Sequence, residues 1–385
     1  MRAKHTYLLL ALAAVTLSAD FDYTVSNTNF TISQPSVFLT DEERYLYNYD
    51  RLRLRSDYTQ NGFFVTFIGD AVNYLGHDYI TSPSFQYVKQ QESDTPFKTQ
   101  TSFYDYYEGT VYAKLYRFYG GYEDADNRVI IGLQNITMGV GRIWTPTNLF
   151  NPRNTYALEP DETFGVAALS YTRHLSSMTD LTVVASQKAD YSFKYAARLK
   201  GFLEFGDVAA NIVSSDETLM LGYEFEANLA ETGVEVRSEG AYIKNSAIRT
   251  LQGEERVEFV QGIVGADYGF ENGITLVGEA LYSSQTFDYN EILLNIDSEI
   301  LPNFVLSYFY LGATVSYAFN LFLDGSLLYI ESFNEQNSRF VSPTLTYTLN
   351  DYNTFTLGAM LQNGPSGSEF GQFGNTYYFR YALSF

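Results

Sequence analysis

The sequence predicts an all-β chain that folds as a single antiparallel β-barrel crossing a membrane. Three observations predict it. Apolar and polar side chains alternate over nearly the whole chain, short turns and long polar loops separate the alternating runs, and a short apolar segment stands near the N-terminus. Alternation with a period of two gives a strand one apolar and one polar face. In a membrane barrel the apolar face meets lipid and the polar face lines the lumen.

The first element is predicted to be a cleaved signal peptide. Arg2 and Lys4 precede the apolar run 7–15, and small residues lead up to Ala19. The run is well short of the roughly 20 residues that a membrane-spanning helix needs. We therefore expect residues 1–19 to direct export and to be removed.

The barrel itself is predicted over residues 44–385. Residues 20–43 are predicted to form either a first strand or a plug inside the lumen. Single-chain bacterial barrels usually have an even number of strands, so we expect about 16–18 in total. The alternating runs after residue 43 are 44–58, 62–75, 102–119, 128–141, 163–173, 180–188, 191–206, 207–215, 217–230, 233–246, 255–270, 274–286, 304–319, 321–333, 338–350, 353–363 and 376–385.

Connections between these runs are of two kinds. Asn-Gly pairs and similar short turns tolerate the positive φ angles of hairpins. The tight connections are 60–62, 205–207, 231–233, 271–273 and 350–353, and the long polar ones are 76–101, 142–163, 287–303 and 365–375. Short turns at one end and long loops at the other are typical of outer-membrane barrels.

Composition excludes several other classes of protein. The chain has 45 Asp and Glu against 24 Lys and Arg, a formal net charge of −21, which does not suit a nucleic-acid partner. It has no cysteine and three scattered histidines, which leave little for metal or general-base chemistry. The sequence therefore predicts no enzyme, no metal site and no cofactor.

Charged side chains recur on the polar faces of the runs. Arg51, Arg53 and Arg55 alternate with leucines, and Glu235, Arg237 and Glu239 form a mixed ladder. They are interpreted either as a pore wall that sets ion preference or as ordinary ion pairs inside the lumen. The pore-lining candidates are Arg51, Arg53, Arg55, Lys194, Arg198, Lys200, Glu235, Arg237, Glu239 and Arg380.

The loop 142–163 is the most distinctive connection. It is rich in Pro and Asn and contains the only tryptophan. It is predicted either to fold into the barrel and narrow the pore, or to form a rigid surface loop with Trp144 in the interfacial aromatic girdle. The constriction candidates are Arg142, Trp144, Arg153, Glu159, Asp161 and Glu162.

The last strand carries a family resemblance. Phe379, Tyr381 and Phe385 lie on one face of an alternating run that ends in Phe, and this resembles the assembly signal of Gram-negative outer-membrane β-barrel proteins of the porin type. The segment 141–152 is similar to one found in several groups of porins and export barrels, where an extra Gly and an Asp, absent here, are common.

The resemblance and the barrel layout together imply a function. We expect an outer-membrane porin for passive diffusion of small hydrophilic solutes or ions, weakly cation-preferring because acidic loops outweigh the basic wall. Two alternatives are transport of a hydrophobic ligand and anchoring of a periplasmic export partner. The expected partners are outer-membrane lipids, the barrel-assembly machinery, small solutes and a possible second copy of the chain, and no nucleic acid.

Overall fold

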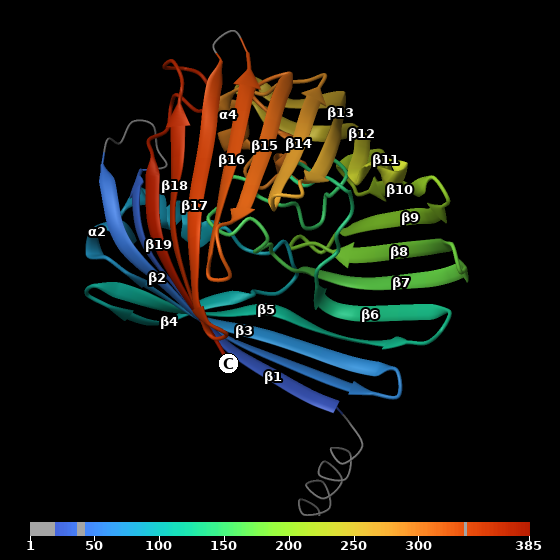
Figure 1. Cartoon of the computed structure of the whole chain (residues 1–385), viewed down its shortest axis with the longest axis horizontal. Helices are drawn as coiled ribbons and strands as arrows, with labels where there is room; N and C mark the ends of the chain where they lie inside the picture. The colour runs from blue at the N-terminus through green and yellow to red at the C-terminus, as the bar shows by residue number, and fades with distance from the viewer. Residues whose placement is uncertain (1–19, 37–42, 335–336) are drawn as a thin grey trace, which may run out of the picture.

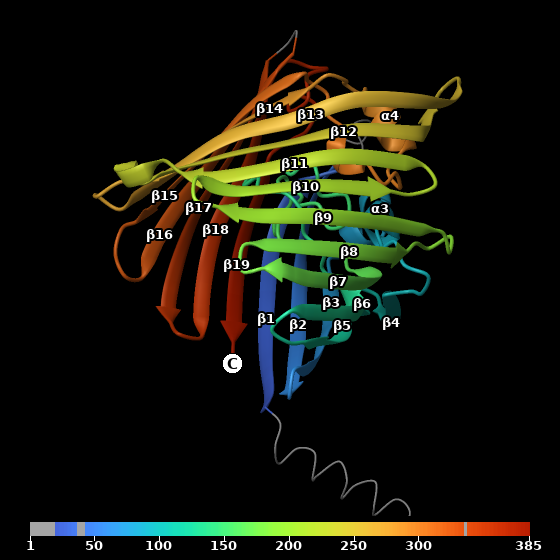
Figure 2. The same cartoon turned by 90° about the vertical axis from the view of Figure 1, so that its right-hand side faces the viewer.

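The computed structural model describes residues 20–36, 43–334 and 337–385, and the expected signal peptide, residues 1–19, lies outside them. One antiparallel sheet of nineteen strands wraps around and closes on itself (Figures 1 and 2). Strand β1 pairs with β2 along one edge and with β19 along the other, and these pairings close the barrel. The prediction of a single antiparallel β-barrel is confirmed.

The elements are as follows. The strands are β1 (Asp20–Pro35), β2 (Arg44–Gln60), β3 (Phe63–Leu75), β4 (Gln100–Tyr106), β5 (Gly109–Glu123), β6 (Asn127–Gln134), β7 (Val166–Ser176), β8 (Thr179–Gln187), β9 (Phe193–Leu203), β10 (Gly206–Ser214), β11 (Thr218–Asn228), β12 (Val234–Thr250), β13 (Gly253–Gly269), β14 (Ile274–Ser283), β15 (Phe309–Ala318), β16 (Leu323–Phe333), β17 (Ser338–Asn350), β18 (Asn353–Asn363) and β19 (Thr376–Ser384). The short helices are α2 (His77–Ile80), α3 (Pro83–Gln90), η1 (Ala230–Thr232), α4 (Tyr289–Leu294) and η2 (Leu301–Asn303).

Eighteen of these strands close the barrel. Strand β4 pairs only with β5, along residues 109–114, whereas β6 pairs with residues 118–123 of β5. The count lies in the predicted range of 16–18. Two predicted strands differ in detail, because 102–119 is the β4–β5 hairpin with a turn at residues 107–108, and the run 128–141 leaves the sheet after Gln134.

The two ends of the barrel differ in the way the sequence predicts. Tight turns join β2 to β3, β9 to β10 and β17 to β18. The first described residue, Asp20, and the C-terminus lie at the same end as these turns, which we name the turn end (Figure 2). Asn61 and Gly62 have φ angles of 50° and 83°, which are the left-handed values of a two-residue hairpin turn. The opposite, loop end carries α2, α3, α4 and the long connections.

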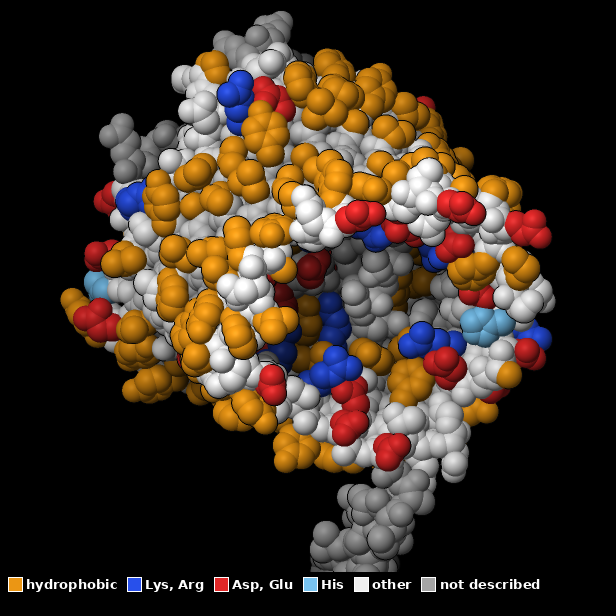
Figure 3. All heavy atoms as spheres, viewed as in Figure 1, with side chains coloured by type: hydrophobic (Ala, Val, Ile, Leu, Met, Phe, Trp, Pro, Cys, Tyr) orange, Lys and Arg blue, Asp and Glu red, His pale blue; other side chains and the backbone are white. Residues whose placement is uncertain are grey.

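The barrel wall has an apolar outer face and a polar inner face. On β2, Leu52 and Leu54 are 49% and 43% exposed on the outside, whereas Arg51, next to Leu52, is buried inside. Figure 3 shows apolar side chains over much of the outer surface on the side in view and charged side chains edging a hollow that opens into the barrel. In lipid, a closed sheet leaves no backbone group unpaired. No helix among the described residues is both long and apolar enough to cross a bilayer.

Loop segments fill much of the interior toward the loop end. An aromatic cluster joins Tyr47 and Tyr74 of the wall to Tyr79 and Phe85 of the α2–α3 segment. Other buried clusters bring the segments 135–165 and 284–308 against the inner wall. The open lumen is therefore narrower than the barrel.

Candidate functional site

The segment between β6 and β7, residues 135–165, lies inside the barrel and is named here the inward loop. Ile136, Met138 and Phe150 are buried in a cluster with side chains of the β7–β13 wall. Figure 1 shows the green trace of this segment crossing the interior. The predicted constriction segment, residues 142–163, thus occupies the lumen and does not lie over the surface.

One buried carboxylate on the wall receives four hydrogen bonds from the inward loop. Glu239 of β12 accepts from the backbone N–H groups of Val140, Gly141 and Thr147 and from Thr147 Oγ1, at 2.7–3.1 Å. The Glu239 side chain is completely buried. A buried charge requires compensation by hydrogen bonds or an opposite charge, and here the loop supplies it.

A second wall carboxylate holds the next residues of the inward loop. Glu279 of β14 accepts from the N–H groups of Arg142, Ile143 and Trp144 at 2.8–3.1 Å. Successive N–H groups that converge on one anion form a concave anion-binding arrangement of the backbone. The arrangement fixes residues 142–144 against the β14 wall.

A third carboxylate, Glu224 of β11, completes this side. It accepts from Gly139 N at 3.0 Å, Asn211 Nδ2 at 2.9 Å and Arg198 Nε at 3.0 Å. Gly139 has a φ of +93°, and a Cβ atom there would lie 2.6 Å from a Glu239 oxygen. Only glycine permits this approach without displacing the carboxylate.

The far half of the inward loop is held by the opposite wall. Here the wall supplies the cationic side chains and the loop supplies the carboxylates. Arg51 of β2 makes two hydrogen bonds of 2.9 Å to Glu159. Arg53 makes two to Glu162, at 2.8 and 2.9 Å, and two of 2.7 Å to Asp70 of β3. Such two-pronged guanidinium–carboxylate pairs are strong and directional. The inward loop therefore bridges two walls of the lumen.

The charge state of this far contact follows from its surroundings. Burial alone would raise the pKa of Glu162, but the hydrogen bond from Arg53 and the charges of Arg51 and Arg53 lower that pKa below its ordinary value. Glu162 is thus anionic at neutral pH. Arg117 of β5 adds a 2.8 Å hydrogen bond to the carbonyl oxygen of Thr163.

A second group of charges lies toward the turn end. The half-exposed Arg142 guanidinium lies 3.1 Å from Glu226, 2.7 Å from Glu235 and 3.5 Å from Asp267. Arg237, whose side chain is completely buried, also pairs with Glu235 and Asp267. Carboxylates outnumber cations in this group, so this part of the lumen carries negative charge.

A third group ties the loop end together. Glu299, on the segment 284–308, lies 2.6 Å from Lys188 Nζ and 3.7 Å from Lys194 Nζ. Burial would lower the pKa of Lys188, but hydrogen bonds and charge from Glu299 and Asp216 raise it above its ordinary value. Lys194 also donates to the carbonyl oxygen of Leu149 at 3.1 Å. Glu299 thereby fastens the segment 284–308 to the wall beside Lys188 and Lys194, and Lys194 also holds the inward loop.

The other predicted charged residues form local contacts. Among the pore-lining candidates, Arg55 pairs with Asp57 at 2.5 Å and Lys200 with Asp207 at 2.9 Å. Arg380 lies over the ring of Phe30, 5.7 Å from its centroid, and has no ion pair among the residues that the structure describes.

Two constriction candidates, Arg153 and Asp161, pair with each other at 3.2 Å within the inward loop. Arg153 also donates to the carbonyl oxygen of Arg142. The structure therefore brings all six constriction candidates into one loop whose two halves are joined, whereas the pore-lining candidates are spread over the wall. Of the latter, Glu239 is covered by the inward loop, and Arg237 is also buried.

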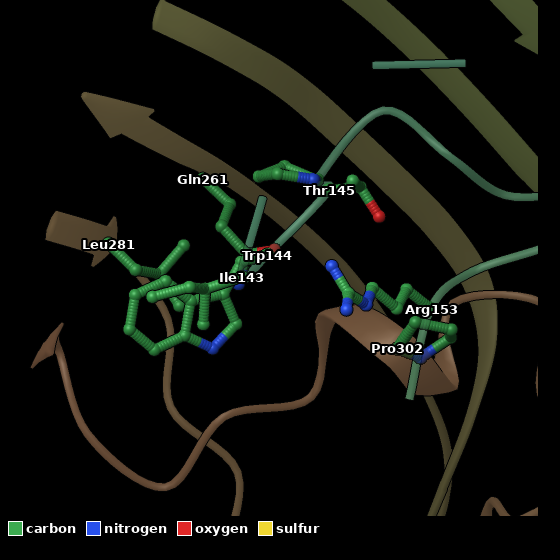
Figure 4. A pocket seen from close by; sticks show the side chains of 8 residues that line it. Ile143, Trp144, Thr145, Arg153, Gln261, Leu281 and Pro302 are labelled. Carbon is green, nitrogen blue, oxygen red and sulfur yellow. The ribbon is translucent and has the colours of Figure 1, made fainter. Parts of the chain in front are cut away.

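Trp144 lies inside the barrel, away from the lipid-facing surface. Its ring centroid is 6.0 Å from that of Tyr310 on β15. Beside it, Ile143 and Leu281 on one side and Arg153 and Pro302 on the other line a cavity of about 30 Å³ (Figure 4). That volume holds about one water molecule, so it is not the path of a solute.

Sequence reasoning missed several residues that the site uses. Glu224 and Glu279 were visible as polar residues at inward positions of alternating runs, but nothing in the sequence indicated what they would contact. Asp70 pairs with Arg53 on the preceding strand, whereas Asp267 and Glu299 pair with residues that lie far away in the chain, Arg142 and Lys188. Lys114 of β5 faces the lumen near Asp70 by its strand register, and the part of the chain that the structure describes gives it no ion pair.

The predicted assembly residues lie at the closing seam of the barrel. Phe379 is 44% exposed on the outside of β19, and its ring lies 6.1 Å from that of Phe355 on β18. Tyr381 stacks on the same ring at 5.1 Å. The backbone N–H of Phe385 donates to Val25 of β1 at 2.9 Å.

Solved structures share this architecture. No family model matches the sequence, and no curated protein matches it either. The chain is similar to OccAB1 of Acinetobacter baumannii, with a TM-score of 0.60, 11% identity, and 95% of this chain and 96% of that chain covered. It is also similar to a BenF-like porin from Pseudomonas fluorescens Pf-5, with a TM-score of 0.58, 11% identity and coverage of 95% and 99%.

A third similar structure is Pseudomonas aeruginosa OpdK with vanillate, with a TM-score of 0.58, 8% identity and coverage of 96% and 99%. These likenesses extend over nearly the full length of every chain compared. The protein therefore has the fold of the outer-membrane porins. At these identities the similarity establishes the fold alone. The function is therefore inferred from the residues that line the lumen.

Proposed function

We propose that this protein is a porin of the Gram-negative outer membrane through which small hydrophilic solutes or ions diffuse passively. One observation carries the proposal: a charged inward loop crosses the lumen and is held by Glu239 and Glu279 on one wall and by Arg51 and Arg53 on the other. A polar lumen narrowed by a fixed charged element is what a size- and charge-selective pore requires.

The outer surface supports the same proposal. Exposed apolar side chains cover the strands of the barrel, and in water this surface would be costly. Surrounded by outer-membrane lipids it is stable, and insertion would need the barrel-assembly machinery. Passive diffusion calls for no catalytic group, cofactor or metal. Among the described residues no group of three or more His, Cys, Asp or Glu side chains is arranged to hold a metal ion.

The alternative of a hydrophobic ligand finds less support in the lumen. The aromatic cluster of the β1–β3 wall is filled by the α2–α3 segment, since Tyr79 stacks on Tyr47 with a centroid distance of 3.6 Å and Phe85 packs against Tyr74. Its side chains are therefore packed together and do not form an open apolar path. We propose no N-terminal plug, because residues 20–35 form strand β1.

Reconstitution tests the function. The folded protein, added to a planar lipid bilayer at nanomolar concentration, should produce stepwise ion conductance, whereas boiled protein should produce none. Vanillate belongs among the first solutes to test as a blocker, because a similar structure contains it and because Lys114 and Arg380 face the lumen without ion pairs in the described chain. Folded protein that inserts without conducting would contradict the proposal. Chemical cross-linking in the same detergent would show whether copies associate.

A further inference from the structure

We propose that Glu239 and Glu279 are positioning residues that fix the width of the pore by holding the inward loop against the β12–β14 wall. The inference rests on the proposed channel function and deepens it. Neither side chain is free to contact a passing solute, because Glu239 is completely buried and Glu279 is 3% exposed. Their role is exerted through the loop that they hold.

The first step of the argument is the donor–acceptor pattern. Glu239 Oε1 accepts from Thr147 N and Oγ1, and its Oε2 accepts from Val140 N and Gly141 N. Every partner is a donor, so the site needs a group that only accepts. A carboxylate only accepts, whereas an amide of the same shape carries two N–H donors on one side.

Glu279 follows the same pattern. Its Oε1 accepts from Ile143 N and Trp144 N, and its Oε2 accepts from Arg142 N. A Glu→Gln exchange at either position would turn an NH₂ group toward backbone N–H donors. The substitution would leave buried donors without acceptors, and each such group costs about 1–3 kcal/mol.

The second step is the shape of the loop. A Cβ atom on Gly139 would lie 2.6 Å from Glu239 Oε2, and one on Gly141 would lie 1.7 Å from the carbonyl oxygen of Trp144. These glycines let the chain bend tightly around Glu239. The bend places the backbone N–H groups of residues 142–144 next to Glu279. The loop conformation and the two carboxylates are therefore matched to each other.

The third step is the second attachment. The far half of the loop is held by Arg51 and Arg53 through Glu159 and Glu162. With both sides fastened, the loop can neither swing toward the wall nor withdraw to the mouth. If the hydrogen bonds to Glu239 and Glu279 are lost, the loop keeps its contacts with Glu224 and Lys194, but residues 140–147 can shift and leave part of the lumen open.

Fluorescence of Trp144 tests the positioning directly. Trp144 is the only tryptophan in the chain, and its backbone N–H is one of the donors to Glu279. In folded protein, acrylamide should quench Trp144 more strongly in E239Q and E279Q than in the wild type. The matched control is E258Q, which makes the same chemical change at an exposed carboxylate on the outer side of β13 and should quench as the wild type does.

Single-channel conductance tests the consequence for pore width. We expect E239Q and E279Q to raise the mean conductance roughly twofold and to increase the open-channel noise, because ion flow depends on the narrowest part of the pore. E258Q should conduct as the wild type does. Circular dichroism and the migration of unboiled protein on SDS gels confirm that each variant is folded.

The outcomes separate the two proposals. Unchanged quenching in the folded variants would overturn the positioning role. Stronger quenching with unchanged or lower conductance would overturn the role in setting pore width. A folded wild-type protein that does not conduct would contradict the channel function itself, and the pore-width role with it.

A second variant covers the case in which the Gln variants do not fold. Gly139→Ala keeps both carboxylates and places a methyl group against Glu239, so it should also increase Trp144 quenching and conductance. Gly269→Ala is its control, since a Cβ atom there meets no atom within 4 Å. Equal behaviour of the two folded glycine variants would overturn the proposal.

Discussion

At the scale of single residues, Glu369 joins a loop to two neighbouring strands of the wall, β15 and β16. It lies in the connection between β18 and β19 and accepts hydrogen bonds from Tyr310 Oη at 2.6 Å and Ser332 Oγ at 2.9 Å. Burial raises the pKa of Glu369 to about 7. Tyr310 also contacts Trp144 of the inward loop. A change in the protonation of Glu369 should therefore alter the surroundings of the Trp144 ring.

This geometry predicts a pH dependence. The pKa of Glu369 is higher in the folded protein than in an unfolded chain, so its protonated form favours the fold. That contribution is complete at pH below about 4.5 and is lost as the pH rises through about 7. We expect Trp144 emission to change with a midpoint near pH 7 and the change to be absent in E369Q.

A histidine variant is the control for this titration, because histidine also titrates near pH 6.5. His174 lies at the far, turn end of β7, paired with Asp180, and His174→Asn should keep the transition. An unchanged transition in E369Q would assign it to another group.

Arg237 gives a second prediction at this scale. Its completely buried side chain pairs with the partly buried Glu235 and Asp267, so its removal leaves these carboxylates with Arg142 as their one remaining cation partner. We expect Arg237→Met to lower the free energy of unfolding by about 3 kcal/mol, as is typical when one partner of a buried pair is lost. Urea unfolding in detergent measures it.

The matched control is Arg339→Met, at an exposed pair with Glu331, where the loss should stay below about 1 kcal/mol. Equal losses for the two variants would show that the Arg237 pair is screened by water.

At the scale of elements, strands were predictable because their signal is local. Alternation along one strand is visible in the sequence, whatever the strand pairs with. The same signal misled at the end of β6, because Ile136, Met138 and Val140 continue the alternation. In the structure these residues belong to the inward loop, where Ile136 and Met138 are buried against the inner face of the β7–β13 wall instead of facing lipid. A buried loop and a half-buried strand can thus share one pattern.

The closing strand yields a prediction for assembly. Strand β19 pairs with both β18 and β1, so the barrel cannot close without it. Phe379 faces outward, and a charge on the lipid side costs about 2–4 kcal/mol at mid-membrane. We expect Phe379→Lys, and likewise removal of Phe385, to reduce sharply the folded fraction seen on unboiled gels of outer membranes. Phe379→Leu should assemble normally, and equal levels of all three variants would contradict the prediction.

At the scale of the whole molecule, the sequence predicted which residues are charged and inward but not which ones meet. Arg51 and Glu159 are 108 residues apart, and Glu279 receives its donors from a loop 135–137 residues earlier. Such contacts depend on how the barrel closes and how far the loop reaches across it. The notable consequence is electrostatic: of the six basic wall residues Arg51, Arg53, Arg55, Lys194, Arg198 and Lys200, each has a carboxylate within 4 Å.

This pairing bears on ion selectivity, which is the last prediction. The basic side chains that would have favoured anions are largely neutralised by their partners, and the turn-end group around Glu226 and Glu235 carries excess negative charge. We therefore expect a modest cation preference, measured as the reversal potential across a salt gradient. It should fade near 1 M salt, where the screening length falls to about 3 Å.

The double variant E226Q/E235Q should weaken the cation preference, whereas E258Q on the outer side should leave it unchanged. If the wild type prefers anions at low salt, the lumen cations without ion pairs in the described chain, Lys114, Arg117 and Arg380, govern the narrowest part of the pore. Their replacement by methionine should then abolish the anion preference.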